Sequence, residues 1–280
     1  MKEQYEKLAK TAATAEEAIN RLNDIMKVLR VECPWDREQN HESIRTCLLE
    51  EAYEVVDAIN NQDDGNLREE LGDVLLQVVF HSLMAEEGKR FNLCDVINEE
   101  CEKMIRRHPH VFLEENLKTI DKVLEKWENI KVKESGNPDW TSRLEKVPRA
   151  LPALTRAKKV QKKAADVGFD WNDVAPAVDK VNEETSELRE AWNMGDREAM
   201  KEELGDLLFS VVNVARFLEV DPEEALTFTT DKFIRRFSHI EKEAMACGRQ
   251  MEDMSLEEMD ALWEQAKRKS ENAPEAGEII

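Results

Sequence analysis

Two stretches of the chain carry the same order of apolar and acidic positions. In residues 68–80 (REELGDVLLQVVF) a Glu and an Asp three residues apart stand at the start of an apolar run, and residues 201–213 (KEELGDLLFSVVN) repeat that order. Steps of three and four residues between apolar positions are typical of a helix that buries one face. The sequence therefore predicts two equivalent helices, whose apolar positions are Leu71, Val74, Leu75, Val78 and Val79 in one and Leu204, Leu207, Leu208, Val211, Val212 and Ala215 in the other.

The correspondence extends to neighbouring segments. A Glu-x-x-Glu pair precedes each run, and the offset between the two copies is the same at every carboxylate, since 184 − 51 and 206 − 73 both equal 133. A register kept in this way indicates an internal duplication. The matching segments are EEAYE and EETSE (50–54 and 183–187), EKMIRRHPH and DKFIRRFSH (102–110 and 231–239), and KWENIK and LWEQAK (126–131 and 262–267).

Short polar turns and capping residues indicate how each copy folds. Residues 60–66 (NNQDDGN) and 193–196 (NMGD) are such turns, so the helix with Glu-x-x-Glu is predicted to fold back against the helix with Glu-x-x-Asp. Asp221-Pro222 is a helix start, and Asn92 stands at the matching place in the first copy. We expect four or five helices per copy, packed as an antiparallel bundle.

The boundary between the copies is predicted from a segment rich in proline. Residues 134–152 contain three prolines and one glycine, which favours a linker. The predicted fold is all-α, with an N-terminal domain at 1–134, a linker at 135–152 and a C-terminal domain at 153–280.

Composition supports a helical protein and excludes several partners. The chain has 36% charged residues and only 9 Gly among its 280 residues, which favours Glu- and Lys-rich helices. Its net charge of −21 argues against a nucleic-acid partner, because binding a phosphate backbone needs a basic surface. A nucleotide held through a metal is still permitted. No apolar run approaches the ~20 residues that span a bilayer, so we expect a cytoplasmic protein with no membrane partner. Its five cysteines include no C-x-x-C, which suggests neither a disulfide framework nor a thiolate metal site.

The paired carboxylates predict a metal site in each copy. Residues three apart share a helix face, so two helices that fold back on each other gather four acids, whose repulsion a cation would relieve. Oxygen ligands alone suit Mg²⁺, or Mn²⁺, rather than zinc. An isolated Glu-x-x-Glu is ordinarily a solvated helix face, but the repetition favours metal. Gly72 and Gly205 are expected to let the helices approach closely. The first quartet is Glu51, Glu54, Glu70 and Asp73, and the second quartet is Glu184, Glu187, Glu203 and Asp206.

Each copy also carries a group of cations at helical spacing. Lys232 and Arg236 share a face, with Arg235 beside them, and Trp263 shares a face with Lys267. The cations could bind phosphate or simply pair with nearby Glu on the surface. The tryptophan could stack on a base or simply pack in the core. The corresponding residues of the first copy are Lys103, Arg106, Arg107, Trp127 and Lys131.

With these motifs assembled, the chain closely resembles the two-copy MazG nucleoside triphosphate pyrophosphohydrolases from about Leu22 to Lys267, including CPWD (33–36), RRHPHVF (106–112) and VGFDW (167–171). The resemblance implies two tandem MazG-like helical-bundle domains in a homodimer that uses Mg²⁺ to convert a (deoxy)nucleoside triphosphate to the monophosphate and pyrophosphate, mainly in the second copy. Its metal ligands carry over to the second quartet, and its nucleotide contacts to Lys232, Arg236, Trp263 and the stretch around Lys180.

The residues themselves favour the second copy. Lys180 lies one turn before Glu184, whereas Cys47 occupies that position in the first copy, and Asn213 corresponds to Phe80. The first copy nevertheless keeps its whole quartet. Glu183, one turn from Glu187, is our hypothesis for the base that accepts the proton of the attacking water.

Two other functions fit part of the pattern. One is a non-catalytic helical regulator that binds nucleotide or protein through the same pockets. The other, a di-iron carboxylate bundle, is weaker because it needs Glu-x-x-His on two helices, and that spacing occurs only from Glu38 to His41.

Overall fold

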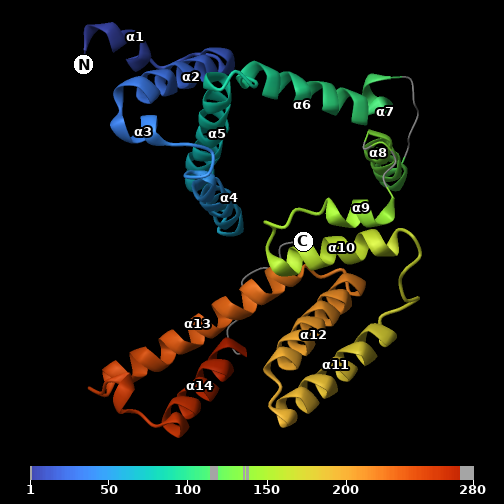
Figure 1. The fold of residues 1–280 in the computed structure, drawn as a ribbon. Coiled ribbons are helices and arrows are strands. Elements are labelled where there is room, and N and C mark those ends of the chain that lie inside the picture. Colours follow the sequence, from blue (N-terminus) through green and yellow to red (C-terminus); the bar gives the residue numbers. More distant parts are fainter. Residues whose placement is uncertain (1, 114–118, 135, 137–138, 272–280) are drawn as a thin grey trace. The chain divides into compact units, whose positions relative to one another are not determined.

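The computed structural model describes residues 2–113, 119–134, 136 and 139–271. Every regular element in these residues is a helix and none is a strand, which confirms the all-α prediction. The chain divides into two compact units, Met1–Ser135 and Gly136–Ile280 (Figure 1). Within the described residues, no helix is both long enough and apolar enough to cross a bilayer.

The first unit contains eight of the described α-helices and the second contains six. In the first unit they follow the short 3-10 helix η1 (Glu3–Tyr5) and are α1 (Glu6–Ala9), α2 (Ala15–Glu32), α3 (Pro34–Glu38), α4 (Arg45–Asn60), α5 (Asp64–Glu87), α6 (Leu93–Arg107), α7 (Pro109–Phe112) and α8 (Ile120–Glu134). In the second unit they are α9 (Trp140–Glu145), α10 (Ala153–Ala165), α11 (Ala175–Met194), α12 (Arg197–Phe217), α13 (Pro222–Ala246) and α14 (Leu256–Glu271), with the 3-10 helix η2 (Met251–Asp253) before α14.

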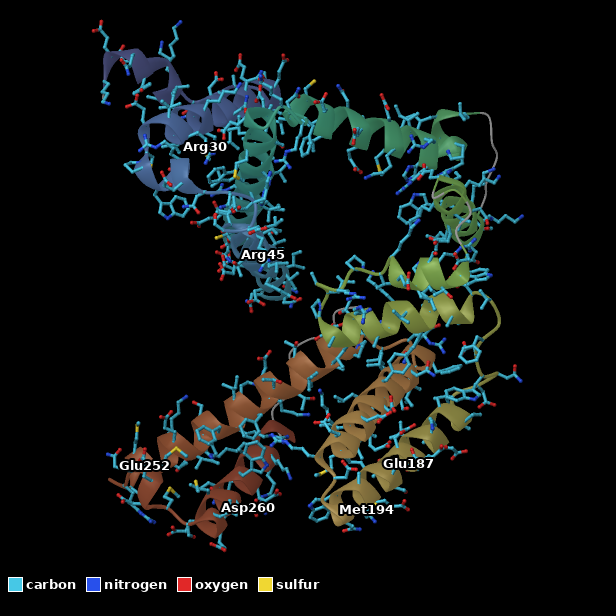
Figure 2. All side chains as sticks on the ribbon, viewed as in Figure 1. Arg30, Arg45, Glu187, Met194, Glu252 and Asp260 are labelled. Atoms are coloured by element: carbon cyan, nitrogen blue, oxygen red, sulfur yellow. The ribbon has the colours of Figure 1, made fainter. Side chains whose placement is uncertain are left out.

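The two predicted helical hairpins are present. Helix α4 packs against α5 and α11 packs against α12. The polar turn between α11 and α12 is possible because Gly195 adopts a left-handed conformation, with φ of 71°, and because Asp196 caps α12 by accepting hydrogen bonds from the Glu198 and Ala199 amides. Met194, labelled in Figure 2, marks the end of α11 at this turn. The predicted helix starts at Asn92 and Asp221 are confirmed by the same kind of cap.

The core of the first unit lies at the C-terminal half of α5. It is built where α2 and the turn before α4 meet that half of the helix, and Arg30 of α2 (Figure 2) ties the same region together by donating to Glu87 at 2.8 Å and to the backbone oxygen of Gln39 at 3.1 Å. The carboxylates of α5 occupy its other half. The buried cluster consists of Met26, Ile44, Val79, Phe80, Leu83 and Met84.

The predicted apolar stripes are only partly buried within the chain. Val79 and Val212 are fully buried and Val74 and Leu207 are half-buried, but three other apolar positions of each helix leave between 37% and 52% of their surface exposed. The expectation that the whole stripe packs inside one copy is therefore wrong, because in each hairpin one face near the quartet has no helix of the same unit across it. The exposed members are Leu71, Leu75 and Val78 on α5 and Leu204, Leu208 and Val211 on α12.

The segment predicted as a linker contains a helix. Helix α9 begins at Trp140, where Asp139 caps it by accepting from the Ser142 amide at 2.9 Å, and it packs against α10. Val147, just after this helix, is 2% exposed. Apolar side chains spaced as in a helix outweigh the prolines here, so this part of the segment belongs to the second unit rather than to an extended connection.

Candidate metal centre and cationic pocket

The hairpin of α11 and α12 brings the second quartet together. Carboxylate oxygens of Glu184, Glu203 and Asp206 lie within 4.8 Å of one another, and those of Glu183, Glu184 and Glu187 form an overlapping group with the same limit. Glu184 belongs to both groups and is therefore the centre of the cluster. Glu187, which Figure 2 labels on α11, joins the cluster from one turn beyond it.

Glu184 has one oxygen occupied and one unpaired. Its side chain is buried at 3% exposure, and its Oε1 receives the Lys180 ammonium at 2.6 Å. Its Oε2 is buried and has no hydrogen-bond partner. A buried carboxylate oxygen without a partner carries a desolvation cost, which a cation at this point would offset. Lys180 also pairs with Glu183 at 2.7 Å, and the hydrogen bonds to these two acids raise the lysine pKa well above its ordinary value.

Glu203 of this cluster holds its proton more tightly than an isolated glutamate does. Burial raises the pKa of Glu203, and the negative charges of Glu187 and Glu184 raise it further. The second quartet therefore carries more negative charge than its surroundings support. A bound divalent cation is the standard way in which a protein stabilises such a set of oxygens.

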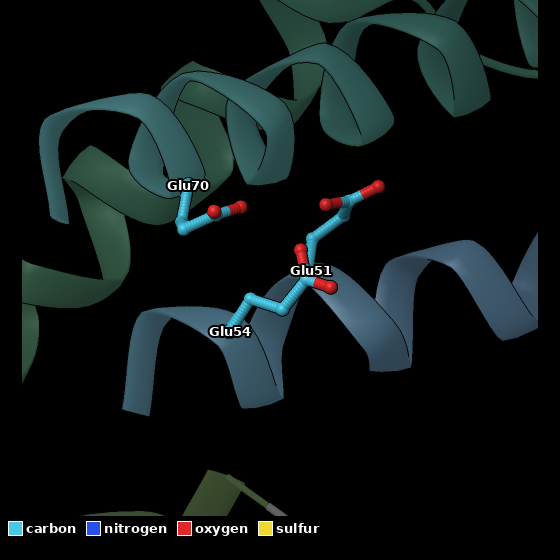
Figure 3. Close-up of side chains that lie close together, drawn as sticks. All are labelled: Glu51, Glu54 and Glu70. Carbon is cyan, nitrogen blue, oxygen red and sulfur yellow. The ribbon is translucent and has the colours of Figure 1, made fainter. Parts of the chain in front are cut away.

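The first quartet shows a similar arrangement on α4 and α5. Carboxylate oxygens of Glu51, Glu54 and Glu70 lie within 4.8 Å of one another, and Figure 3 shows the side chains of α4 reaching toward that of α5. Burial raises the pKa of Glu51 and of Glu70. Asp73 lies outside this close group, although its charge contributes to both shifts.

The two quartets differ mainly in whether a lysine lies beside them. Cys47, the counterpart of Lys180, is an uncharged thiol, so the first quartet has no ammonium of the Lys180 kind beside it.

The glycines between the paired acids do not serve close packing. A Cβ added at Gly72 or at Gly205 would meet no atom within 4 Å. The expectation that these glycines let the two helices approach is therefore wrong for the described residues, because a side chain at either position would meet open space.

The predicted cations of the second copy line a pocket between α13 and α14. Its volume is about 380 Å³. Among the described residues, Lys232, Arg235 and Arg236 form no ion pair, so the surface-pairing alternative does not hold for them. The Nε of Arg236 is also buried without a hydrogen-bond partner. We call this the cationic pocket, and its lining residues are Phe228, Lys232, Arg235, Arg236, His239, Ala266 and Lys269.

Aromatic rings set the orientation of these cations. The Arg236 guanidinium lies 5.5 Å from the centre of the Trp263 ring, and that ring packs at 5.0 Å against Phe233. Trp263 is thus half-buried and packs beneath an arginine. It is neither a fully buried core residue nor a fully exposed ring for base stacking. Lys267 does pair with a neighbouring acid, Glu264, at 2.5 Å.

Four pocket residues were absent from the sequence prediction, namely Phe228, His239, Ala266 and Lys269. Phe228 precedes Lys232 by one helical turn, and His239 follows Arg236 by three residues, so helical spacing on α13 would have found both. Lys269 comes from α14, and only the packing of the two helices places it in the pocket.

Asn213 is engaged away from the quartet. Its Oδ1 accepts from Arg216 Nε at 2.9 Å, and Arg216 also binds Asp170 at 2.5 Å. This network fastens the VGFDW segment to α12. Arg216 therefore holds the amide oxygen of Asn213 in one chain, and a contact of Asn213 with substrate stays a prediction.

The second quartet and the cationic pocket lie on different helical hairpins of the second unit. The carboxylates come from α11 and α12, whereas the pocket is lined by α13 and α14. The charges that raise the pKa of Glu203 are all carboxylates. None of the four acids of the second quartet is among the residues that line the cationic pocket.

Comparison with known proteins connects both copies to one family. A family model described as the MazG nucleotide pyrophosphohydrolase domain matches residues 39–112 and 166–241, and each match contains one quartet and the Lys-x-x-Arg-Arg motif of the same copy. The chain is 45% identical over 255 residues to the nucleoside triphosphate pyrophosphohydrolase of Escherichia coli (strain K12), covering 89% of this chain and 97% of that protein. It is 45% identical over 248 residues to the nucleoside triphosphate pyrophosphohydrolase/pyrophosphatase MazG of Thermotoga maritima, covering 88% of this chain and 94% of that protein. It is 50% identical over 236 residues to the uncharacterized protein YabN of Bacillus subtilis (strain 168), covering 84% of this chain and 48% of that one.

Proposed function

The chain belongs to the MazG nucleotide pyrophosphohydrolase family and hydrolyses nucleoside triphosphates; from this premise we propose that it converts nucleoside and deoxynucleoside triphosphates to the monophosphate and pyrophosphate with Mg²⁺, mainly in its second copy. The observation that carries the proposal is the buried, unpaired Oε2 of Glu184 at the centre of five clustered carboxylates. Because the chain belongs to a family of enzymes, the alternative hypothesis of a non-catalytic regulator has no support.

The second quartet fits a hard divalent cation. Its ligand atoms are all carboxylate oxygens, and they form two overlapping groups whose atoms lie within 4.8 Å of one another. Burial, and then the charges of its acidic neighbours, raise the pKa of Glu203. Mg²⁺ prefers such oxygens and shares its coordination with substrate phosphates, and Mn²⁺ would fit the same set. When bound, the ion supplies positive charge that polarises phosphate oxygens and lowers the pKa of water.

The cationic pocket would hold the phosphates that leave. Lys232 and Arg236 have no acidic partner among the described residues, so their N–H groups remain available for phosphate oxygens. In the proposed reaction, water attacks the α-phosphorus, the bond to the bridging oxygen breaks, and pyrophosphate leaves while these cations stabilise its charge. Arg235, Trp263 and Lys267 complete the proposed substrate contacts.

Glu183 is the proposed base. It is exposed and belongs to the same carboxylate group as Glu184 and Glu187, so it lies beside the quartet without being buried in it. Lys180 donates to it at 2.7 Å. We expect Lys180 to turn toward a phosphate when substrate binds, which would free Glu183 to accept the proton of the attacking water.

The proposal that the second copy does most of the work rests on the same lysine. A triphosphate carries several negative charges into a cluster of acids, and a nearby ammonium reduces that repulsion. The second copy has Lys180 at this place and the first copy has Cys47.

We also propose that two chains associate. Apolar side chains near both quartets stay exposed in one chain, among them Leu204 and Leu208 at 48% and 50%. Exposed apolar patches of this kind mark association surfaces. A homodimer would cover them, and it would also allow a cationic pocket to meet a quartet that lies on a different hairpin.

Product analysis tests the reaction directly. The purified chain is incubated with one triphosphate at a time, with Mg²⁺ or with a chelator, and the phosphorus-containing products are separated. We expect monophosphate and pyrophosphate in equal amounts and only with the metal. Diphosphate with inorganic phosphate, or turnover that persists in the chelator, would contradict the proposal.

A further inference from the structure

The cation group of the first copy is occupied by an acid of its own unit. Glu134, the last residue of α8, places Oε1 2.5 Å from Arg106 Nε and Oε2 2.6 Å from Arg107 Nη2. Oε2 also accepts from Arg107 Nε at 3.0 Å. Both oxygens of the Glu134 carboxylate are therefore engaged. Arg107 donates two N–H groups to it, and arginine side chains also bind phosphate through two N–H groups.

A proline in the first copy explains why the acid can reach the arginines. Helix α6 ends at Arg107 after 15 residues, because Pro109 cannot continue it. The chain then turns through α7 and returns as α8, whose end packs beside the end of α6. The matching helix of the second copy, α13, carries no such proline and runs for 25 residues.

The second copy has no acid at the corresponding position. Trp127 and Trp263 correspond at an offset of 136, and the same offset takes Glu134 to Ser270. Arg235 and Arg236, the counterparts of the paired arginines, form no ion pair among the described residues. The two copies thus differ in whether their arginines already hold a carboxylate.

A cavity beside α6 in the first unit does not replace the occupied group. It has a volume of about 690 Å³ and includes Lys103 and Arg106, but Asp95, Glu99, Glu100 and Glu102 line it as well. Lys103 is moreover paired with Glu100. A wall with this many carboxylates repels a triphosphate rather than binding it.

We propose that Glu134 decides which copy anchors a triphosphate, by occupying the arginine N–H groups of the first copy that a phosphate would otherwise take. This inference rests on the proposed function of the cationic pocket. It explains how the first copy can keep a whole metal quartet and yet contribute little to hydrolysis. The first copy would bind metal through its acids but would not hold the charged end of the substrate.

The test measures triphosphate binding by the first copy alone. In the full chain, Lys232→Ala together with Arg236→Ala removes the anchor of the second copy, and E134S is added to that background. The probe is the Mg²⁺ complex of a triphosphate with a methylene bridge between its α- and β-phosphorus, titrated calorimetrically. We expect E134S to bind the probe about tenfold more tightly than the background, the scale of one charge-assisted hydrogen bond. The matched control E134D keeps a carboxylate and should show a smaller gain or none.

A reciprocal change tests the same idea in the second copy. S270E, made in the otherwise unaltered chain, gives α14 the acid that α8 carries and should weaken probe binding about tenfold, whereas S270Q should leave it unchanged. A folded E134S variant without any gain overturns the inference. If E134S does not fold, unchanged binding by S270E overturns it. An unaltered chain that releases no pyrophosphate refutes the proposed function instead, so the two failures are distinguishable.

Discussion

At the scale of single residues, Lys180 sets the electrostatics of the second quartet. Its ammonium lies between Glu183 and Glu184, where it neutralises part of the negative charge of the cluster. This reduces the repulsion among the carboxylates and the repulsion between them and a triphosphate. Its position one turn before Glu184 was predictable from helical spacing. The unpaired Oε2 of Glu184 was not, because it depends on how two hairpin helices are rotated about their axes.

Replacing Lys180 tests its part in substrate binding. K180M keeps the length of the side chain but removes the charge, so we predict a KM for triphosphate raised about tenfold or more, the effect expected from losing one charged contact. Steady-state pyrophosphate release measures it. K180R retains the charge and should lie closer to the unaltered chain, and equal KM values in all three proteins would exclude a contact with substrate.

The raised pKa of Glu203 predicts how metal affinity depends on pH. The metal-free carboxyl keeps its proton above the ordinary Glu pKa, and Mg²⁺ must displace that proton. Affinity for Mg²⁺ should therefore rise as pH increases from 4.5 through the raised pKa and then level off. The metal-free chain should lose stability over the same interval, because ionising Glu203 is less favourable in the folded state. Calorimetric titrations at a series of pH values check this, and E203Q should show a flatter profile.

At the scale of elements, the capped hairpins explain what the sequence could and could not predict. Short polar turns and side-chain caps such as Asp196 and Asn92 are local signals, so the helix starts and the antiparallel pairs were predictable. Helix α9 was not predicted because the prolines and the glycine on either side of it suggested a linker, whereas the helix packs on α10. The separation of the quartet and the cationic pocket onto two hairpins depends on tertiary packing, which periodicity does not contain.

A chain of hydrogen bonds joins the turn before α4 to α5 and to the residues after it. Arg90 Nη2 lies 2.6 Å from His41 Nε2, and His41 Nδ1 lies 2.8 Å from His81 Nδ1. Because Arg90 can only donate, His41 must accept at Nε2 and donate from Nδ1 to His81. The Nε2 of His81 then carries the proton and is buried without a partner. The ring of His81 is held neutral in this arrangement.

This chain of hydrogen bonds predicts acid sensitivity of the first unit. Burial, and then the charge of His41, lowers the pKa of His81. The unfolded chain therefore takes up a proton near pH 6.5 that the folded chain resists. Stability should be constant above that pH and should fall as pH decreases below it toward the lowered pKa. Thermal unfolding of the chain from pH 8 to pH 5.5 measures the loss, and His81→Gln should reduce its steepness. An identical slope in the variant would contradict the assignment.

At the scale of the whole molecule, the exposed apolar faces near the quartets are the basis of the proposed homodimer. The sequence predicted these faces as helix stripes, but it could not tell whether they would be covered by the same chain or by another. The duplication, the two units and the family were all readable from the repeated motifs. How chains pair was not, because pairing depends on surfaces that several helices form together.

The proposed homodimer can be tested on the exposed face of α12. Leu208 is 50% exposed in one chain, and L208E would place a charge where a second copy is proposed to pack. Burying an unpaired charge costs several kcal/mol, so we predict dissociation to monomers in sedimentation experiments at micromolar concentration. K201E adds the same side chain at a polar position of α12 and should leave the dimer intact. Dimers that persist in L208E would place the interface elsewhere.

The central claim, that the second quartet holds the metal that the reaction needs, is tested most directly by a matched pair of substitutions. E203Q and E70Q each remove one negative charge at equivalent positions of the two quartets, and pyrophosphate release with Mg²⁺ is measured for both. We predict that E203Q lowers turnover about a hundredfold or more, the scale of losing one charge-stabilising group at a reaction centre, while E70Q stays within about threefold of the unaltered chain on the same scale. Unchanged turnover in a folded E203Q variant would contradict the account.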